Sequence, residues 1–272
     1  IGLLMFKYLA EARKSGMGGG MPWYPVAART TVTSSIIDRI AAKYGIEVKK
    51  TPTGFKYIGE LIRELEEDGR KDDFIFGLEE SCSYLSGSYV RDKDGVSSAA
   101  LICLMTAKAK AEGMTLAEAI DKIYEEYGYT VNKLINFKFD VLSGMNKTEE
   151  IVKSLRRAES RILSEASGVA AAAVADADNA GCKCETYAGS RITEIIDYMR
   201  GAKGFPKVDM IEYHLENGAE FTVRPSGTEP KLKIYISASG TSREEAENLA
   251  EMIAEDLKIK IDGMTGGSEY EK

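Results

Sequence analysis

The stretch of residues 224–231 reads Arg-Pro-Ser-Gly-Thr-Glu-Pro-Lys and combines the groups that bind phosphate. Its arginine can hold an oxyanion through two parallel hydrogen bonds, and its two hydroxyls and the local amides can donate more. Its glycine lets the backbone approach a ligand without a Cβ in the way. The candidate phosphate-binding residues are Arg224, Ser226, Gly227, Thr228 and Lys231. An ordinary polar connection, in which the arginine and the glutamate pair with each other, fits the same composition.

A second group of polar residues, Glu79-Glu80-Ser81, follows directly on a predicted strand over residues 73–78. In open α/β sheets, ligands bind at the carboxyl ends of the strands. Carboxylates placed there can accept hydrogen bonds from neighbouring hydroxyls, such as those of a sugar. The alternative is a strand end whose glutamates face water.

Two further segments carry groups that could contact a sugar phosphate. Arg91 and Lys93 precede a predicted helix that Asp94 can cap, which would leave both cations to face a phosphate or a transferring oxygen. Thr53 and Gly54 form a turn after another predicted strand. Taken separately, the first segment also fits a solvated charge cluster, and the second is a weak signal.

The single histidine, His214, lies in a predicted strand beside the Asn217-Gly218 turn, where a structural role fits it. No Ser-His-Asp arrangement can be assembled around it. The spacing of His, Cys and acidic residues along the chain shows no metal-ligand pattern, so we predict no metal site. Cys182 and Cys184 are one residue apart, which is not the Cys-x-x-Cys spacing of common metal and redox motifs.

The elements that must position these groups differ between the two halves of the chain. In the first half, strands alternate with helices, which predicts a helix-covered, mostly parallel sheet of the α/β class. The helix after residue 115 has a Thr115–Glu118 capping box. The strands are expected over residues 27–32, 46–51 and 73–78, and the helices over 3–14, 36–44, 57–67 and 96–112.

In the second half, an Asn-Gly pair between alternating apolar residues predicts a hairpin, and with it a smaller α+β domain with an antiparallel sheet. Strands are expected over 130–141, 210–215, 220–223 and 232–237, and helices over 147–163, 192–199 and 242–257. Residues 166–181, rich in Ala and Gly, fit either a linker or a short buried strand. We place the two domains at residues 1–145 and 146–272.

Bulk composition limits the function classes. The 272 residues are 44% hydrophobic and 29% charged, with a net charge of -7, which argues against a nucleic-acid partner. The chain has no run of roughly 20 apolar residues, so no membrane span is expected. Four cysteines do not make a disulfide framework, and a cytoplasmic location follows as the expectation. The chain begins with Ile1, already in a helical pattern, which suggests a piece of something longer.

Taken in order along the chain, these motifs resemble the α-D-phosphohexomutase superfamily, in its phosphoglucomutase and phosphomannomutase branch. The motifs that carry the resemblance are Thr53-Gly54-Phe55-Lys56, Gly77-Leu78-Glu79-Glu80-Ser81, Arg91-Asp92-Lys93-Asp94-Gly95 and Arg224 to Lys231. Thr31-Val32-Thr33-Ser34 and Tyr127-Gly128-Tyr129 fit as well. One departure is Ser83, which stands where the family usually has glycine. The resemblance runs from the first residue to about residue 257, apart from 166–181, and corresponds to the third and fourth of the family's four domains.

The resemblance implies roles for individual residues. Glu79 and Ser81 would hold sugar hydroxyls, and Thr53 and Gly54 would belong to a loop that senses sugar orientation. Arg91 and Lys93 would line the cleft, with Lys93 assisting proton transfer. The loop residues Arg224, Ser226, Gly227, Thr228 and Lys231 would hold the phosphate that is not being transferred.

The resemblance also implies that the phosphorylated serine and the loop that binds Mg²⁺ belong to the family's first two domains, whose motifs this chain lacks. The expected function is therefore the carboxyl-terminal half of an enzyme that interconverts hexose 1-phosphate and 6-phosphate through a hexose 1,6-bisphosphate. Glucose is favoured, with phosphomannomutase and phosphopentomutase as alternatives, and the chain alone is expected to be inactive. An alternative from a different class is a stand-alone sugar-phosphate binding module.

Overall fold

The computed structural model describes residues 1–139, 144–166, 186–201, 205–227, 229–265 and 269–271, and these divide into two compact units, Ile1–Thr130 and Val131–Lys272. Each unit has its own sheet and its own hydrophobic core. Within the described ranges, we find no helix with the length and apolar character that crossing a membrane requires.

The first unit is a three-stranded parallel sheet with one antiparallel edge strand, in the order β2-β1-β3-β4. The strands are β1 (Val26–Thr30), β2 (Glu47–Thr51), β3 (Phe74–Glu79) and β4 (Ser83–Leu85). The helices are α1 (Gly2–Lys14), α2 (Ile36–Tyr44), α3 (Phe55–Glu67), α4 (Gly95–Ala111) and α5 (Leu116–Tyr127). Short 3-10 turns occur at η1 (Met17–Gly19) and η2 (Lys71–Asp73).

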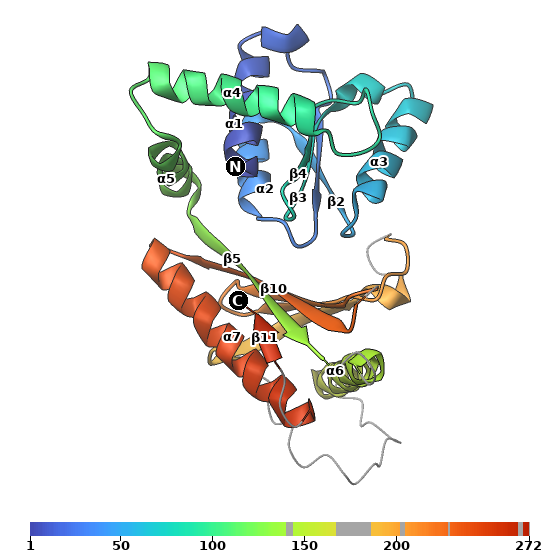
Figure 1. Cartoon of the computed structure of the whole chain (residues 1–272). Coiled ribbons are helices and arrows are strands. Elements are labelled where there is room, and N and C mark those ends of the chain that lie inside the picture. The colour runs from blue at the N-terminus through green and yellow to red at the C-terminus, as the bar shows by residue number, and fades with distance from the viewer. Residues whose placement is uncertain (140–143, 167–185, 202–204, 228, 266–268, 272) are drawn as a thin grey trace. The chain divides into compact units, whose positions relative to one another are not determined.

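Helices cover both faces of this sheet, because its central strands are apolar on both sides (Figure 1). On β1, Ala27 packs in the core that α1, α2, α4 and α5 share. Its neighbours Val26 and Ala28 point the other way, into the core under α3. Runs that are buried on both faces are typical of a parallel sheet.

The second unit is a seven-stranded sheet in the order β11-β5-β10-β9-β8-β7-β6. Its strands are β5 (Tyr129–Lys138), β6 (Thr186–Tyr187), β7 (Ser190–Asp197), β8 (Ile211–Leu215), β9 (Glu220–Pro225), β10 (Lys231–Gly240) and β11 (Glu269–Glu271). Its helices are α6 (Gly144–Ala166) and α7 (Arg243–Thr265), with a 3-10 turn η3 (Tyr198–Arg200).

Both long helices of the second unit pack against one core, and alternate residues of the strands supply its other side. Tyr213 of β8, Phe221 of β9 and Ile234 of β10 belong to this core. Because side chains alternate along a strand, the residues between them form the opposite face of the sheet. That face carries Glu212, His214, Glu220, Arg224 and Lys233.

The fold class agrees with the sequence prediction: a mostly parallel α/β unit followed by an antiparallel one. The compact units, however, divide between Thr130 and Val131, before the expected boundary at residue 145. The reason is β5, most of which lies in the second unit, where it is a neighbour of β10 and pairs with β11.

The helix predicted over residues 192–199 is wrong, since Ser190–Asp197 forms β7 and pairs antiparallel with β8. Apolar residues at Ile192, Ile195, Ile196 and Met199 have helical spacing. The register shifts between Ile192 and Glu194, and such an irregularity displaces the two-residue alternation of a strand. The Ala- and Gly-rich stretch of residues 167–181 lies outside the described residues.

Candidate functional site

The turn at Gly54 and the end of β3 meet at the carboxyl edge of the first sheet. The Gly54 amide donates a 2.6 Å hydrogen bond to Oε1 of Glu79, although the two residues are 25 positions apart. Glu79 is buried, and its carboxylate lies at the N-terminus of α3, where the helix dipole favours negative charge. The predicted sugar-binding strand end and the predicted turn are therefore brought together.

Three hydroxyl groups lie near this edge, those of Thr53, Ser81 and Ser83, and they differ in whether they have a hydrogen-bond partner. Ser81 Oγ lies 3.3 Å from Ser83 Oγ. Thr53 Oγ1 is buried and has no hydrogen-bond partner among the described residues. A buried hydroxyl without a partner is uncommon and fits a group that serves a ligand. Between the two serines, Cys82 has a left-handed backbone, with φ at 56°, so the unusual conformation falls one residue before the serine that departs from the family pattern.

The segment before α4 is held more firmly than the sequence indicates. Asp94 caps α4 as predicted, accepting hydrogen bonds from the Val96 and Ser97 amides. The Arg91 guanidinium forms an exposed ion pair with Glu66 of α3 and donates to the Ser88 carbonyl at 2.9 Å. The nearby cations Lys71 and, after it, Arg91 hold the pKa of Glu66 below its ordinary value.

Lys93, the predicted aid to proton transfer, is exposed, and its Nζ lies 3.2 Å from Asp92. An exposed ion pair of this kind contributes little to stability, so it leaves the ammonium able to change partners. Sequence inspection did not reveal the Glu66 partner of Arg91, because α3 and this segment meet only in the folded unit.

The phosphate-loop candidate is shorter than the eight residues predicted. β9 continues to Pro225 and β10 begins at Lys231, so the connection is residues 226–230. The Ser226 amide donates to the Lys231 carbonyl at 2.8 Å, which closes the loop. Gly227 is exposed at its tip, and Thr228 lies outside the described residues.

Arg224 does not pair with Glu229, as the alternative interpretation of the loop required. Glu229 instead contacts Lys231, whose Nζ lies 2.9 Å away. Its pKa is held below the ordinary value by Lys231 first, with contributions from Lys233 and Lys138. Several cations therefore surround the base of this loop.

Lys233 is a cation beside the loop that the sequence analysis did not single out. It lies directly opposite Arg224 in the β9–β10 register, on the face away from the core. Neither side chain has an ion-pair partner among the residues that the structure describes. Like charges directly opposite on neighbouring strands destabilise a sheet, and an anion between them would remove that cost. Arg224 lies two positions before the connection and Lys233 three positions after it, so their pairing emerges only from the strand register.

His214 has acidic neighbours that the spacing along the chain does not reveal. Its Nε2 lies 2.7 Å from Oε1 of Glu212, and its Nδ1 lies 3.6 Å from Oε2 of Glu220. The hydrogen bond to Glu212 is the main reason why the pKa of His214 is raised. Glu220 escapes a search by spacing because it lies across the Asn217-Gly218 hairpin.

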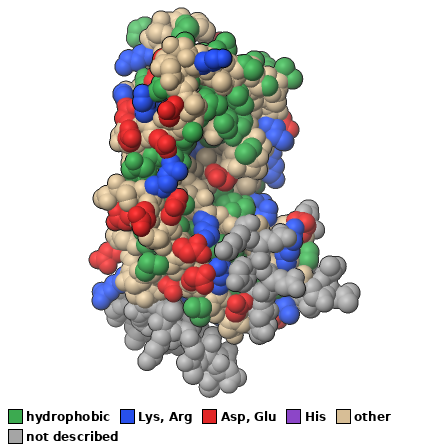
Figure 2. Space-filling model, turned by 60° about the vertical axis from the view of Figure 1, so that its left-hand side comes forward, with side chains coloured by type: hydrophobic (Ala, Val, Ile, Leu, Met, Phe, Trp, Pro, Cys, Tyr) green, Lys and Arg blue, Asp and Glu red, His purple; other side chains and the backbone are tan. Residues whose placement is uncertain are grey.

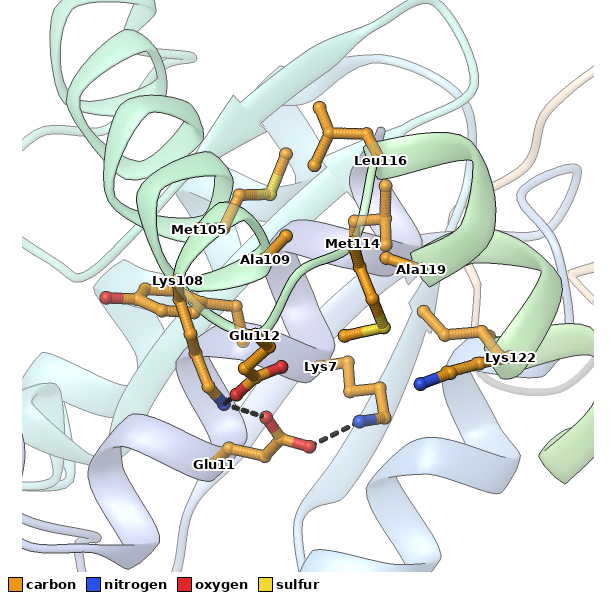
Figure 3. A pocket seen from close by; sticks show the side chains of 13 residues that line it. Lys7, Glu11, Met105, Lys108, Ala109, Glu112, Met114, Leu116, Ala119 and Lys122 are labelled. Carbon is orange, nitrogen blue, oxygen red and sulfur yellow. Dashed lines mark hydrogen bonds and ion pairs between the residues drawn. The ribbon is translucent and has the colours of Figure 1, made fainter.

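A pocket of the first unit lies between α1, α4 and α5, away from the predicted site residues. Figure 3 shows Lys7 and Lys108 directed toward Glu11, beside the apolar side chains of Met105 and Leu116. The lysines hold the pKa of Glu11 below its ordinary value despite the opposing effect of burial.

On the face seen in Figure 2, acidic and basic side chains are interspersed, and no broad basic surface is visible among the described residues.

Comparison with known proteins gives consistent matches for both units. The family described as "Phosphoglucomutase/phosphomannomutase, alpha/beta/alpha domain III" matches residues 1–127, and "Phosphoglucomutase/phosphomannomutase, C-terminal domain" matches residues 165–256. Phosphoglucomutase of Staphylococcus haemolyticus is 32% identical over 237 residues, which are 87% of this chain and 39% of that protein. A probable phosphomannomutase of Haemophilus influenzae is 28% identical over 250 residues, 92% of this chain and 42% of that protein.

Among solved structures, the open form of the phosphoglucomutase parafusin from Paramecium matches with a TM-score of 0.61 at 21% identity. The match covers 98% of this chain and 42% of that one, and supports the fold. The chain thus spans about two fifths of the length of the relatives it matches.

Proposed function

Because the chain belongs to the α-D-phosphohexomutase superfamily and matches its domains III and IV, we propose that it is the sugar- and phosphate-binding portion of a hexose phosphomutase. The proposed reaction interconverts hexose 1-phosphate and 6-phosphate through a phosphoserine and a hexose 1,6-bisphosphate. The observation that carries the proposal is the hydrogen bond from Gly54 to Glu79, since it joins two of the predicted sugar-binding segments at the carboxyl edge of one sheet.

In this proposal the Glu79 carboxylate accepts hydrogen bonds from sugar hydroxyls, and the Ser81 hydroxyl donates to them or accepts from them. Gly54 orients the Glu79 carboxylate, and Thr53 supplies a hydroxyl that has no described protein partner. Lys93 assists proton transfer, which its weak, exposed pairing with Asp92 allows. Arg91 contributes mainly by holding its own segment against α3 through Glu66.

Arg224 binds the phosphate that is not being transferred, together with Ser226, Gly227, Thr228 and Lys231, and Lys233 adds charge from the neighbouring strand. A bisphosphate intermediate has to present each of its phosphates in turn. A loop that contacts only phosphate oxygens can accept either end of the sugar, which a loop that reads the sugar could not.

Phosphoryl transfer depends on positioning and on stabilising charge, and the family uses Mg²⁺ for the latter. Mg²⁺ prefers an octahedral set of oxygen ligands. Among the described residues, the group able to hold a metal includes the imidazole of His214, which does not fit that preference. We therefore assign Mg²⁺ to the part of the relatives that this chain does not match, and we place the phosphorylated serine there as well because the family resemblance implies it.

The proposal is tested by calorimetry with glucose 1-phosphate and with mannose 1-phosphate, which also compares the two hexoses. We expect Arg224→Ala to weaken binding about tenfold or more, because a hydrogen bond to a charged group contributes roughly 1.5–3 kcal/mol. Arg91→Ala is the matched control. It also removes a guanidinium, but one that is already paired with Glu66, so its effect on binding should be smaller. Equal affinities of the parent chain and the Arg224 variant would refute the assignment.

A phosphomannomutase or phosphopentomutase of the same branch remains the alternative within this class, and a stand-alone binding module is the alternative outside it. Tighter binding of mannose 1-phosphate or of a pentose phosphate would favour the first. The gene sequence upstream of Ile1 distinguishes the enzyme from the stand-alone binding module. A phosphorylatable serine loop and an aspartate loop encoded there would favour the enzyme.

A further inference from the structure

Three potential metal ligands gather on the outer face of the second sheet. Glu212 and His214 lie two positions apart on β8, so both side chains are on the same face. Glu220 lies directly opposite His214 in the β8–β9 register. The reverse face of these strands is the hydrophobic core, so the backbone that carries the three residues is well supported.

The three ligand atoms are close enough for one ion. One nitrogen of His214 and one oxygen each from Glu212 and Glu220 all lie within 4.8 Å of one another. The closest pair, His214 Nε2 and Glu212 Oε1, is 2.7 Å apart. Two atoms that bind one ion at about 2.0–2.2 Å are at most about 4.4 Å apart, so a spacing as wide as 4.8 Å must close by a few tenths of an ångström for all three to ligate.

Glu212 is also held from behind, as ligating carboxylates usually are. Its second oxygen, Oε2, accepts a 2.5 Å hydrogen bond from the Tyr198 hydroxyl. Burial, and after it the charge of Glu212, raises the pKa of Tyr198, so this hydroxyl remains a donor. Tyr198 is packed with Ile196 and Met210, which fixes its position.

The charge around His214 is strongly negative. The groups whose charges act on the imidazole are Glu212, Glu220 and, opposite it on β7, Glu194. Glu212 is 6% exposed, and a carboxylate that is buried to this degree needs a positive partner. His214 and Glu220 are both 27% exposed, so the outer side of the cluster is open to solvent, to an entering ion and to water ligands.

We propose that Glu212, His214 and Glu220 form a binding site for a divalent transition-metal ion of the Zn²⁺ class. One imidazole and two carboxylates match the ligands that Zn²⁺ accepts, with water completing the coordination. The ion takes the place of a proton on the ring nitrogen of His214 that ligates it. It ties β8 to β9 and, through Tyr198, to the segment after β7, which indicates a structural role.

The test is a titration of the full chain with ZnCl₂ at pH 7.5 by calorimetry, in a background in which all four cysteines are serine. That background excludes thiolate binding. We expect one saturable equivalent, lost in His214→Ala and in Glu220→Gln. Tyr198→Phe should weaken binding about 10–100-fold, since it removes only the support of a ligand. Glu216→Gln is the matched control, because it removes a nearby exposed glutamate outside the cluster and should bind like the parent.

Two further readouts separate a metal site from a simple ion pair. Zn²⁺ and His214 protons compete, so binding should tighten as the pH rises from 6 to 8. Zn²⁺ should raise the melting temperature of the parent and not that of His214→Ala, with circular dichroism showing that both are folded. No saturable binding by the parent, or binding that His214→Ala and Glu220→Gln both retain, would overturn the proposal.

Discussion

Arg224 and Arg91 carry the same guanidinium, and their neighbours decide what each can do. Arg91 is engaged by Glu66 and by the Ser88 carbonyl. Arg224 faces another cation, Lys233, across the hairpin. Sequence inspection ranked both as anion-binding candidates, because it reads residue types and local order but not contacts between distant segments.

His214 leads to a prediction about pH in the metal-free protein. Its pKa is raised in the folded chain, mainly by Glu212, so protonated His214 stabilises the fold. This contribution is fully present below the unfolded pKa of about 6.5 and is lost as the pH rises through the raised folded pKa. We expect the stability difference between the parent and His214→Gln to be largest near pH 6 and to shrink toward pH 9.

Urea unfolding with EDTA present, at several pH values, measures that difference directly. Using the difference removes the contributions of titrating groups that do not interact with His214. A difference that stays constant from pH 6 to pH 9 would contradict the role of the Glu212–His214 pair.

At the scale of elements, α3 and the segment before α4 approach unusually closely at Gly59. A Cβ at this position would fall well inside the contact distance of the Arg91 carbonyl oxygen. Helix propensity alone predicts that Gly59→Ala stabilises the protein by roughly 1 kcal/mol. We expect the opposite, a loss of about 1–3 kcal/mol, because the added methyl group overpacks a backbone contact.

Denaturant unfolding of Gly59→Ala and of Gly263→Ala checks this expectation. Gly263 lies in α7, and a Cβ there meets no atom within 4 Å, so the same substitution should be neutral or stabilising. If both variants gain stability, the contact between α3 and Arg91 does not constrain the fold.

The elements that sequence patterns predicted well are those with local signals. Asp94 caps α4, Thr115 and Glu118 form the capping box of α5, and Gly218 closes the β8–β9 hairpin. β7 was predicted incorrectly because its irregular register imitates helical spacing. A different limit hid the proposed metal-ligand cluster and Lys233, because both depend on pairing across a hairpin.

At the scale of the whole molecule, the division of labour in the proposed enzyme predicts that this chain does not turn over substrate. Purified chain, supplied with glucose 1-phosphate, Mg²⁺ and a trace of glucose 1,6-bisphosphate, should form no glucose 6-phosphate above background. Calorimetry on the same sample should still detect binding, which shows that the chain is folded and competent. Measurable turnover would contradict the assignment of the serine and metal loops to the unmatched part of the relatives.

The facing cations of the β9–β10 hairpin have a consequence for how this protein is handled. A site that recognises charge rather than a sugar cannot distinguish a substrate phosphate from inorganic phosphate or sulfate. If Arg224 and Lys233 bind phosphate as proposed, buffer anions compete for them, and added salt weakens the attraction by screening it. Under this proposal, sugar-phosphate affinities measured in phosphate buffer will be weaker than the true values, and the apparent dissociation constant will depend on the buffer anion.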